Sequence, residues 1–185
     1  MTQISSVSSA AWSVPQLSFV TAGQELPSWL SRQELTTFLH EHMKPYEDTL
    51  ADVRRGLDDA LGNRPGPGGF VVLAHLDAQL AGALVMLGTG MQGYIPEHLL
   101  LFVAVDRSLR NRGIGELLIR SALERCDGDV KLHVEHENPA KRLYERLGFV
   151  SKYADMRLRK AVRACTGSSS TWRRSSTICA PSTGG

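Results

Sequence analysis

The spacing of hydrophobic residues divides the first third of this chain into a short strand and two helices. Residues 17–20 form an apolar run that predicts a strand. Apolar residues then recur at helical spacing over 29–43 and again over 49–61, which predicts two amphipathic helices. Ser31 is suited to cap the start of the first helix, and Pro45 is expected to end it.

Strand spacing follows the Gly- and Pro-rich stretch 62–69. Residues 70–75 and 79–87 predict a hairpin, and the unbroken apolar run 99–105 predicts a strand covered on both faces. The later predicted elements are a helix over 113–126, a strand over 130–135, a helix over 139–147 ended by Gly148, and a final hairpin over 149–158. This order predicts an α/β fold, with a mixed, mostly antiparallel twisted sheet and helices on both faces.

Composition separates the two ends from this patterned part. Residues 1–15 are rich in Ser and are expected to form a disordered leader, and residues 16–160 are expected to form one domain. Residues 161–185 are dominated by Ser, Thr and Gly, and we expect a disordered tail, with a cloning or reading-frame product as the alternative origin.

Charge and cysteine usage exclude several classes of function. The net charge is +2, but the tail holds three arginines and no acid, so the predicted domain has slightly more acidic than basic residues. Nucleic acid and membrane surfaces are therefore not expected partners. Without a signal-peptide pattern or a spanning apolar segment, a cytoplasmic location is expected. Cys126, Cys165 and Cys179 fit no metal-binding spacing, so we expect free thiols and no metal site.

Candidate chemistry lies where the run 99–105 meets the next predicted helix, in Arg110-Asn111-Arg112-Gly113-Ile114-Gly115. The first amides of a helix lack partners and carry about half a positive charge, so they favour an anion. Arg110 and Arg112 can add charge-assisted bonds. Pyrophosphate is the natural ligand, although an ordinary turn into a helix shows the same G-x-G pattern. The dinucleotide fingerprint is absent because position 118 is Leu, and no P-loop signature occurs.

A second motif follows the strand predicted at 130–135. It consists of Asn138-Pro139-Ala140, then Leu143-Tyr144, then Gly148-Phe149. Together with Arg110-x-x-Gly113-x-Gly115, it resembles the GNAT superfamily of acetyl-CoA-dependent N-acetyltransferases over about residues 16–160, with bacterial members of unassigned substrate most similar. The resemblance implies acetyl-CoA as co-substrate, no metal, and a primary amine of a small molecule or peptide as acceptor. It also implies direct attack in a ternary complex.

The resemblance assigns roles to individual residues. The strand end Val103-Ala104-Val105 would hold the pantetheine arm and the acetyl carbonyl, and Tyr144 would protonate the departing thiolate. Asn138 would bond the pantetheine arm, with Glu137 as the alternative because the spacing to Ala140 is one residue shorter than is usual in the family. The pyrophosphate would be bound by the backbone amides of Arg110, Asn111, Arg112, Gly113, Ile114 and Gly115.

The sequence leaves the general base open. His133 and Glu135 share one face of a predicted strand and are the candidates to relay the proton, whereas Tyr94 and Glu97, in the loop before the long apolar run, are candidates to line the acceptor site. For each of them, an ordinary structural role is the alternative. His42 is expected at the surface. A non-catalytic acyl-CoA-binding or sensor module is the alternative function, and a homodimer is one alternative for the oligomeric state.

Overall fold

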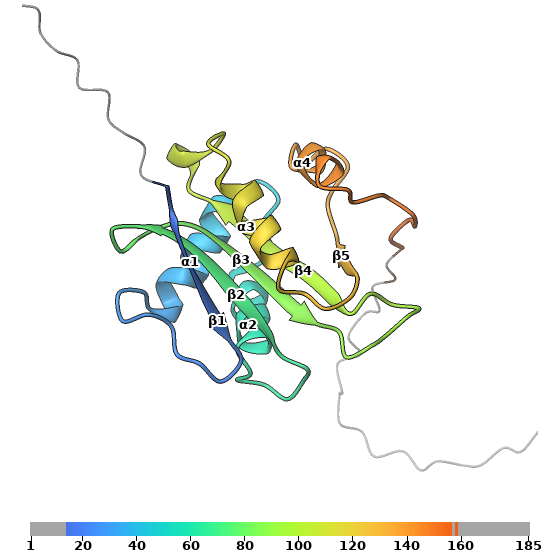
Figure 1. Cartoon of the computed structure of the whole chain (residues 1–185), viewed down its shortest axis with the longest axis horizontal. Coiled ribbons are helices and arrows are strands. Elements are labelled where there is room, and N and C mark those ends of the chain that lie inside the picture. Colours follow the sequence, from blue (N-terminus) through green and yellow to red (C-terminus); the bar gives the residue numbers. More distant parts are fainter. Residues whose placement is uncertain (1–13, 157, 159–185) are drawn as a thin grey trace, which may run out of the picture. The chain divides into compact units, whose positions relative to one another are not determined.

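A computed structural model describes residues 14–156 and 158 of the chain (Figure 1). The chain consists of two units, residues 1–150 and 151–185, and the helices and strands of the described residues all lie in the first. Nearly all of the predicted leader, and the whole of the predicted tail with Cys165 and Cys179, lie outside the described residues.

Five strands form one sheet in the order β1-β2-β3-β4-β5. Four of them pair in antiparallel fashion with their neighbours, and the short β5 runs parallel to β4. This confirms the prediction of a mixed, mostly antiparallel sheet. The strands are β1 (Gln16–Thr21), β2 (Gly69–Leu76), β3 (Gln79–Gly88), β4 (His98–Val105) and β5 (Val130–Leu132).

Helices cover both faces of the sheet, as the sequence predicted. In Figure 1, α3 crosses in front of the sheet while α1 and α2 lie behind it. The hydrophobic core is correspondingly divided into one cluster on each face. The helices are α1 (Arg32–Met43), α2 (Leu50–Ala60), α3 (Ile114–Leu123) and α4 (Lys141–Arg146), with a short 3-10 helix η1 (Arg107–Leu109) before α3.

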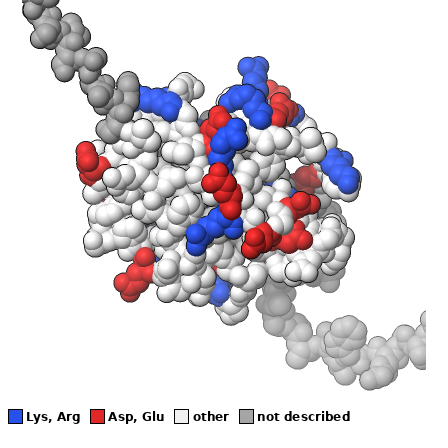
Figure 2. Space-filling view, in the orientation of Figure 1, with Lys and Arg blue, Asp and Glu red and all other residues white. Residues whose placement is uncertain are grey.

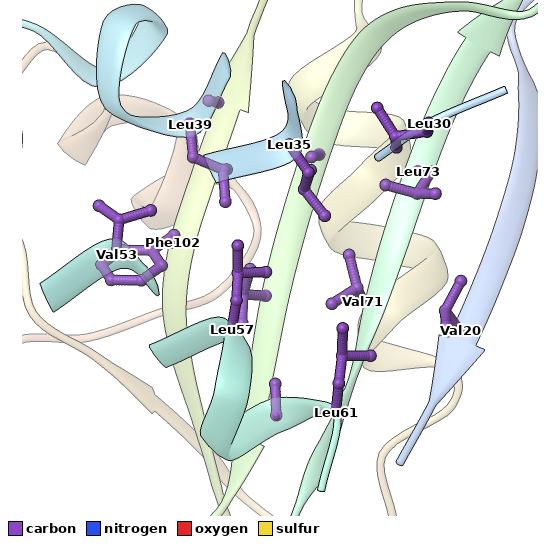
Figure 3. Packing of buried hydrophobic residues seen from close by; sticks show 14 residues of the cluster. Val20, Leu30, Leu35, Leu39, Val53, Leu57, Leu61, Val71, Leu73 and Phe102 are labelled. Atoms are coloured by element: carbon purple, nitrogen blue, oxygen red, sulfur yellow. The ribbon is translucent and has the colours of Figure 1, made fainter. Parts of the chain in front are cut away.

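The first core cluster joins α1 and α2 to the sheet (Figure 3). Leu35 of α1 and Leu57 of α2 are fully buried and belong to the same cluster as Leu73 of β2. Ser31 is the N-cap that the sequence predicted, because its hydroxyl accepts from Glu34 N at 3.2 Å while the Glu34 carboxylate accepts from Ser31 N at 2.7 Å. This reciprocal capping box fixes where α1 begins.

The second cluster places α3 close against β3. Leu118 and Ile119 are fully buried there. A Cβ added at Gly82 of β3 would lie 2.9 Å from Leu118 Cδ1 and 3.1 Å from Ala104 O, so glycine allows the helix to pack closely on the strand. This contact holds the first turn of α3 beside the end of β4.

The structure corrects the predicted elements near the C-terminal end of the domain. The strand predicted over 130–135 ends at Leu132, and the helix predicted over 139–147 spans Lys141–Arg146. The final hairpin predicted over 149–158 is wrong for the described residues, none of which forms a strand there. Tyr153 and Met156 are 81 % and 92 % exposed, so their apolar side chains gain no burial that would stabilise strand pairing.

Candidate active site

The site is built around a stretch of β4 that pairs with β3 on one side but not with β5 on the other. β4 and β5 pair only from His98–Val130 to Leu100–Leu132, after which β4 continues to Val105 while β5 ends. The register of β3 against β4 shifts between Val85 and Met86, so Leu101 is an extra residue on β4. Such a bulge bends a strand away from regular pairing. On the side opposite β3, residues 101–105 therefore have no neighbouring strand among the described residues, and this side of β4 is here called the open edge.

Strand alternation decides which backbone groups face the open edge. Asp106 N donates to Ala81 O at 2.9 Å, so the main chain of Asp106 faces β3. The same orientation recurs at Ala104, and the N–H and C=O groups of Val103 and Val105 point away from β3. Of the three strand residues predicted to hold the coenzyme, Val103 and Val105 thus present backbone groups to the open edge, whereas Ala104 does not.

The turn of residues 110–115 presents unpaired amides at the start of α3. Asn111 and Gly113 have φ values of 62° and 81°, and the first helical bond runs from Leu117 N to Gly113 O. The amides of Asn111, Gly113, Ile114 and Gly115 donate to no other group within residues 14–156 and 158. A Cβ at Gly113 would meet nothing within 4 Å, so this backbone is open to a ligand. The helix dipole favours an anion at this position.

Three elements converge on Gly115. A Cβ added there would lie 3.5 Å from Leu143 Cδ2 of α4 and 3.7 Å from Val105 Cγ2 of β4. The first turn of α3, the end of the open edge and the helix that carries Tyr144 are therefore neighbours. The structure brings together the two sequence motifs that lie about 25 residues apart in the chain.

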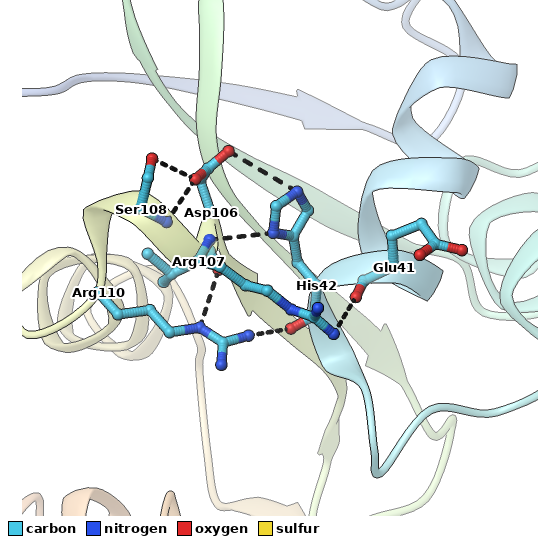
Figure 4. A network of polar contacts seen from close by, with 7 residues as sticks. Glu41, His42, Asp106, Arg107, Ser108 and Arg110 are labelled. Atoms are coloured by element: carbon cyan, nitrogen blue, oxygen red, sulfur yellow. Dashed lines mark hydrogen bonds and ion pairs between the residues drawn. The ribbon is translucent and has the colours of Figure 1, made fainter.

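The side chain of Arg110 does not share the direction of the amides. It donates to His42 O at the end of α1, and its Nε lies 3.4 Å from Val105 O (Figure 4). Arg107 makes a parallel contact, donating from Nη2 to Glu41 O at 3.1 Å. The sequence suggested a charge-assisted bond from Arg110 to an anion, but here its guanidinium contacts protein carbonyls.

His42, which the sequence led us to expect at the surface, is partly exposed and belongs to the same network. Its side chain is 21 % exposed, with Nδ1 accepting from Arg107 N at 3.1 Å and Nε2 at 3.7 Å from Asp106 Oδ2 (Figure 4). Burial lowers the pKa of His42, and the hydroxyl bond from Ser108 lowers the pKa of Asp106. A neutral His42 with its proton on Nε2 fits both contacts. Its acceptor nitrogen, Nδ1, is therefore already hydrogen-bonded to Arg107 N.

Tyr144 lies on α4 with its ring enclosed and its hydroxyl unpaired. The residue is 8 % exposed, and the hydroxyl has no hydrogen-bond partner among the described residues. Burial raises the pKa of Tyr144 to about 12. The phenol is therefore protonated across the physiological range and is available as a donor.

The end of α4 explains why Gly148 and Phe149 belong to the motif. Gly148 has a φ of 94°, Gly148 N donates to Glu145 O at 3.1 Å and Phe149 N donates to Tyr144 O at 3.0 Å. These are the two bonds of a Schellman C-cap, which confirms the predicted helix end. The cap brings Phe149 edge-on to Tyr144, with ring centroids 5.9 Å apart. Glycine at 148 thus helps to fix the Tyr144 ring.

Asn138 begins the turn that leads into α4. Its Oδ1 accepts from Ala140 N at 2.9 Å, which leaves Nδ2, with no described partner, as the group that a ligand can use. Glu137, the alternative residue, is exposed, and its carbonyl accepts from Tyr46 Oη at 3.0 Å. Tyr46 follows α1, so this bond joins the α1–α2 loop to the segment after β5.

The candidate bases, His133 and Glu135, and the candidates to line the acceptor site, Tyr94 and Glu97, differ in their contacts. His133 and Glu135 are exposed beyond the end of β5, and Tyr94 is 84 % exposed. Glu97 accepts from Asp129 N at 2.8 Å and Gly93 N at 3.2 Å, and these backbone bonds lower its pKa, so it has a structural role.

Sequence reasoning missed Glu47, in the α1–α2 loop. Its Oε2 is buried without a hydrogen-bond partner among the described residues. Since a buried acceptor without a donor is uncommon, this oxygen is a candidate contact for a ligand. The only signal in the sequence was an acidic residue in a short loop between two helices.

Within residues 14–156 and 158, no group of three or more His, Cys, Asp or Glu side chains is arranged to hold a metal ion. None of the helices described there has the length and apolar character required to span a bilayer. Lys and Arg are interspersed with Asp and Glu on the face seen in Figure 2, without a continuous field of one sign.

Comparison with known proteins agrees with this geometry. Residues 67–151 match the family model of the acetyltransferase (GNAT) domain. A search of curated proteins gave no match.

Solved structures share the fold at low sequence identity. A possible acetyltransferase from Clostridium difficile 630 has a TM-score of 0.56 and 16 % identity, covering 82 % of this chain and all of that one. A GNAT family acetyltransferase from Streptococcus pneumoniae TIGR4 has a TM-score of 0.55 and 16 % identity, covering 79 % and 98 %. A ribosomal-protein-alanine N-acetyltransferase from Brucella melitensis biovar Abortus 2308 has a TM-score of 0.53 and 16 % identity, covering 79 % and 99 %. Residues 67–151 therefore match the GNAT acetyltransferase domain, and the chain shares its fold with these acetyltransferases.

Proposed function

We propose that the protein transfers the acetyl group of acetyl-CoA to a primary amine of a small molecule or peptide, with both substrates bound together. The observation that carries this proposal is the set of unpaired amides in the 110–115 turn, next to the open edge of β4. Phosphate recognition needs such donors, and an extended arm needs free strand groups. The amides of the turn and the open edge of β4 are neighbours at Gly115.

The residues present fit the parts of the coenzyme. The amides of Asn111, Gly113, Ile114 and Gly115 would bind the diphosphate, and the backbone groups of Val103 would pair with the pantetheine arm. Asn138 Nδ2 would donate to the same arm. Acetyl-CoA supplies the activated acetyl group, as a thioester.

Val105 and Tyr144 would act at the two ends of the breaking bond. The N–H of Val105 faces the open edge and would donate to the acetyl carbonyl oxygen as negative charge develops. A donor of this kind is typically worth about 2.7–4 kcal/mol. Tyr144 would donate to the departing sulfur. Full proton transfer from a phenol of pKa about 12 to a thiolate of pKa about 8.5 is uphill by about 5 kcal/mol, so hydrogen bonding is the favoured role.

The acceptor must lose a proton before it attacks. A free alkylamine with a pKa of about 10.4 is mostly protonated at neutral pH. The buried, unpaired carboxylate oxygen of Glu47 provides an acceptor for such an ammonium group. Tyr46, beside it in sequence, reaches the segment after β5, so this loop is suited to form part of the acceptor side. Positioning of two bound reactants supplies much of the rate.

A thiol-release assay with a panel of amines and peptides tests the proposal. The wild-type protein should release CoA from acetyl-CoA steadily in the presence of at least one amine, and Glu47→Gln should lower kcat/KM for that amine. Binding of CoA without release for any acceptor would contradict the enzyme and favour a non-catalytic acyl-CoA-binding module.

A further inference from the structure

We infer that Arg110 is a positioning residue, whose side chain fixes the 110–115 turn to α1 and to the end of β4 while the amides of the turn bind the diphosphate. The inference rests on the proposed function and assigns this arginine a role distinct from direct phosphate binding. It is carried by the contacts drawn in Figure 4.

The C-terminal carbonyls of α1 receive donors from the connection between β4 and α3. The last four carbonyls of a helix lack partners within the helix. Glu41 O accepts from Arg107, and His42 O accepts from Arg110. Because this end of a helix carries partial negative charge, it favours two guanidinium groups. The positive charge of Arg110 therefore interacts with the C-terminal end of α1.

The same guanidinium also fixes the last peptide group of β4. Arg110 Nε lies 3.4 Å from Val105 O, and the N–H of that peptide group, which belongs to Asp106, donates to Ala81 O at 2.9 Å. The peptide group is thus bound at both ends, to Arg110 and to β3. Val105 carries the N–H proposed to act on the acetyl carbonyl. The Arg110 side chain therefore links the acetyl end of the site with the diphosphate end.

The shape of the side chain makes the inference testable. A planar guanidinium donates from Nε and Nη2 to two carbonyls at once, which a lysine ammonium, as a compact point charge, cannot reproduce in the same geometry. A phosphate contact tolerates lysine better, since lysine keeps the charge. Arg110→Lys therefore distinguishes the two roles without removing the positive charge.

The experiment compares Arg110→Lys with two matched variants of the wild-type chain. Arg107→Lys changes the other guanidinium that contacts α1, which makes no contact with Val105 O among the described residues. Arg120→Lys changes an arginine paired with Glu116 on the surface of α3. Calorimetry gives the Kd for CoA, kinetics with the best amine give kcat and KM, and thermal melting shows that each variant is folded.

We expect Arg110→Lys to weaken CoA binding about tenfold, the loss that follows from one charge-assisted hydrogen bond, and to lower kcat as well. Arg107→Lys should change either value by less than about threefold, and Arg120→Lys by less still. Tight CoA binding by both wild type and Arg110→Lys, with kcat unchanged, would overturn the inference. Failure of the wild type to bind CoA would overturn the proposed function and the inference together.

A measurement on the wild type covers the case in which Arg110→Lys does not fold. The Nε–H signal of Arg110 is followed by NMR as CoA is added. A positioning role predicts a smaller shift for this signal than for the backbone amide of Gly113. A larger shift at Arg110 Nε–H would show direct contact with the diphosphate and would overturn the inference.

Discussion

The 110–115 turn and helix α4 would contribute to the proposed site in different ways. The turn offers backbone amides, and it is held by a ten-residue helix buried against β3 and by Arg110 against α1. Helix α4 has six residues and offers one side chain, Tyr144, placed by a C-cap and by the ring of Phe149. A diphosphate can be bound by main chain alone, whereas a leaving sulfur needs a donor of chosen acidity. Coenzyme binding at the turn would therefore depend on the contacts that hold the turn in place, and the role of α4 would depend on the position of the Tyr144 ring.

The largest expected difference between the two regions is the loss of folding stability when a buried side chain is shortened. Leu118→Ala removes a fully buried side chain beneath α3 and should lower the free energy of unfolding by about 3 kcal/mol. Leu147→Ala, at the half-buried end of α4, should cost less than about half of that. Denaturant unfolding measures both, and equal losses would show that α4 is anchored as firmly as α3.

Removal of the Tyr144 hydroxyl should act on chemistry alone. Tyr144→Phe keeps the ring against Phe149 and should lower kcat about 100-fold, with the Kd for CoA within about threefold of wild type. Tyr153→Phe, at an exposed tyrosine, serves as the matched control. An unchanged kcat in Tyr144→Phe would remove this hydroxyl from the mechanism.

Backbone strain in the turn should act on coenzyme binding. Gly113 has a φ of 81°, so Gly113→Ala strains the turn by roughly 1–2 kcal/mol and should weaken CoA binding about tenfold. Gly115→Ala should weaken it less, because its added Cβ would make only ordinary contacts with Leu143 and Val105. Calorimetric titration of both variants is the measurement, and a greater loss at Gly115 would contradict the assigned geometry.

The smallest expected effect is a pH dependence of stability that reports on Tyr144. Its pKa of about 12 in the folded protein exceeds the unfolded value of about 10, so the unfolded state loses the proton first as pH rises. Stability present below pH 10 is therefore lost between pH 10 and 12. At pH 11 the wild type should have lost about 1 kcal/mol more than Tyr144→Phe, relative to pH 8. Parallel loss in both proteins would show that the phenol is not buried as described.

Local pattern was sufficient where short-range forces decide the structure. Ser31 followed by Glu34 predicted a helix start, and Gly148 predicted a helix end, because capping acts between residues three to five apart. The two motifs likewise placed Gly113 and Tyr144 correctly on their elements, at the start of α3 and within α4. The outline of the sheet followed from alternation and apolar runs.

Long-range contacts set the limits of prediction. His42 and Arg107 are 65 positions apart and His42 and Arg110 are 68 apart, so no local pattern shows that they meet. The early end of β5 and the missing hairpin at 149–158 depend on whether a neighbour covers these residues, which alternation alone does not specify. The buried oxygen of Glu47 is invisible in sequence for the same reason.

The central claim is that the unpaired amides at the start of α3 bind the diphosphate of the coenzyme. An NMR titration of ¹⁵N-labelled wild-type protein with CoA tests it most directly. The account predicts that the backbone amides of Asn111, Gly113, Ile114 and Gly115 shift most and saturate together with one CoA bound. Saturable binding that leaves these four amides unmoved, or no binding at millimolar CoA, would contradict it.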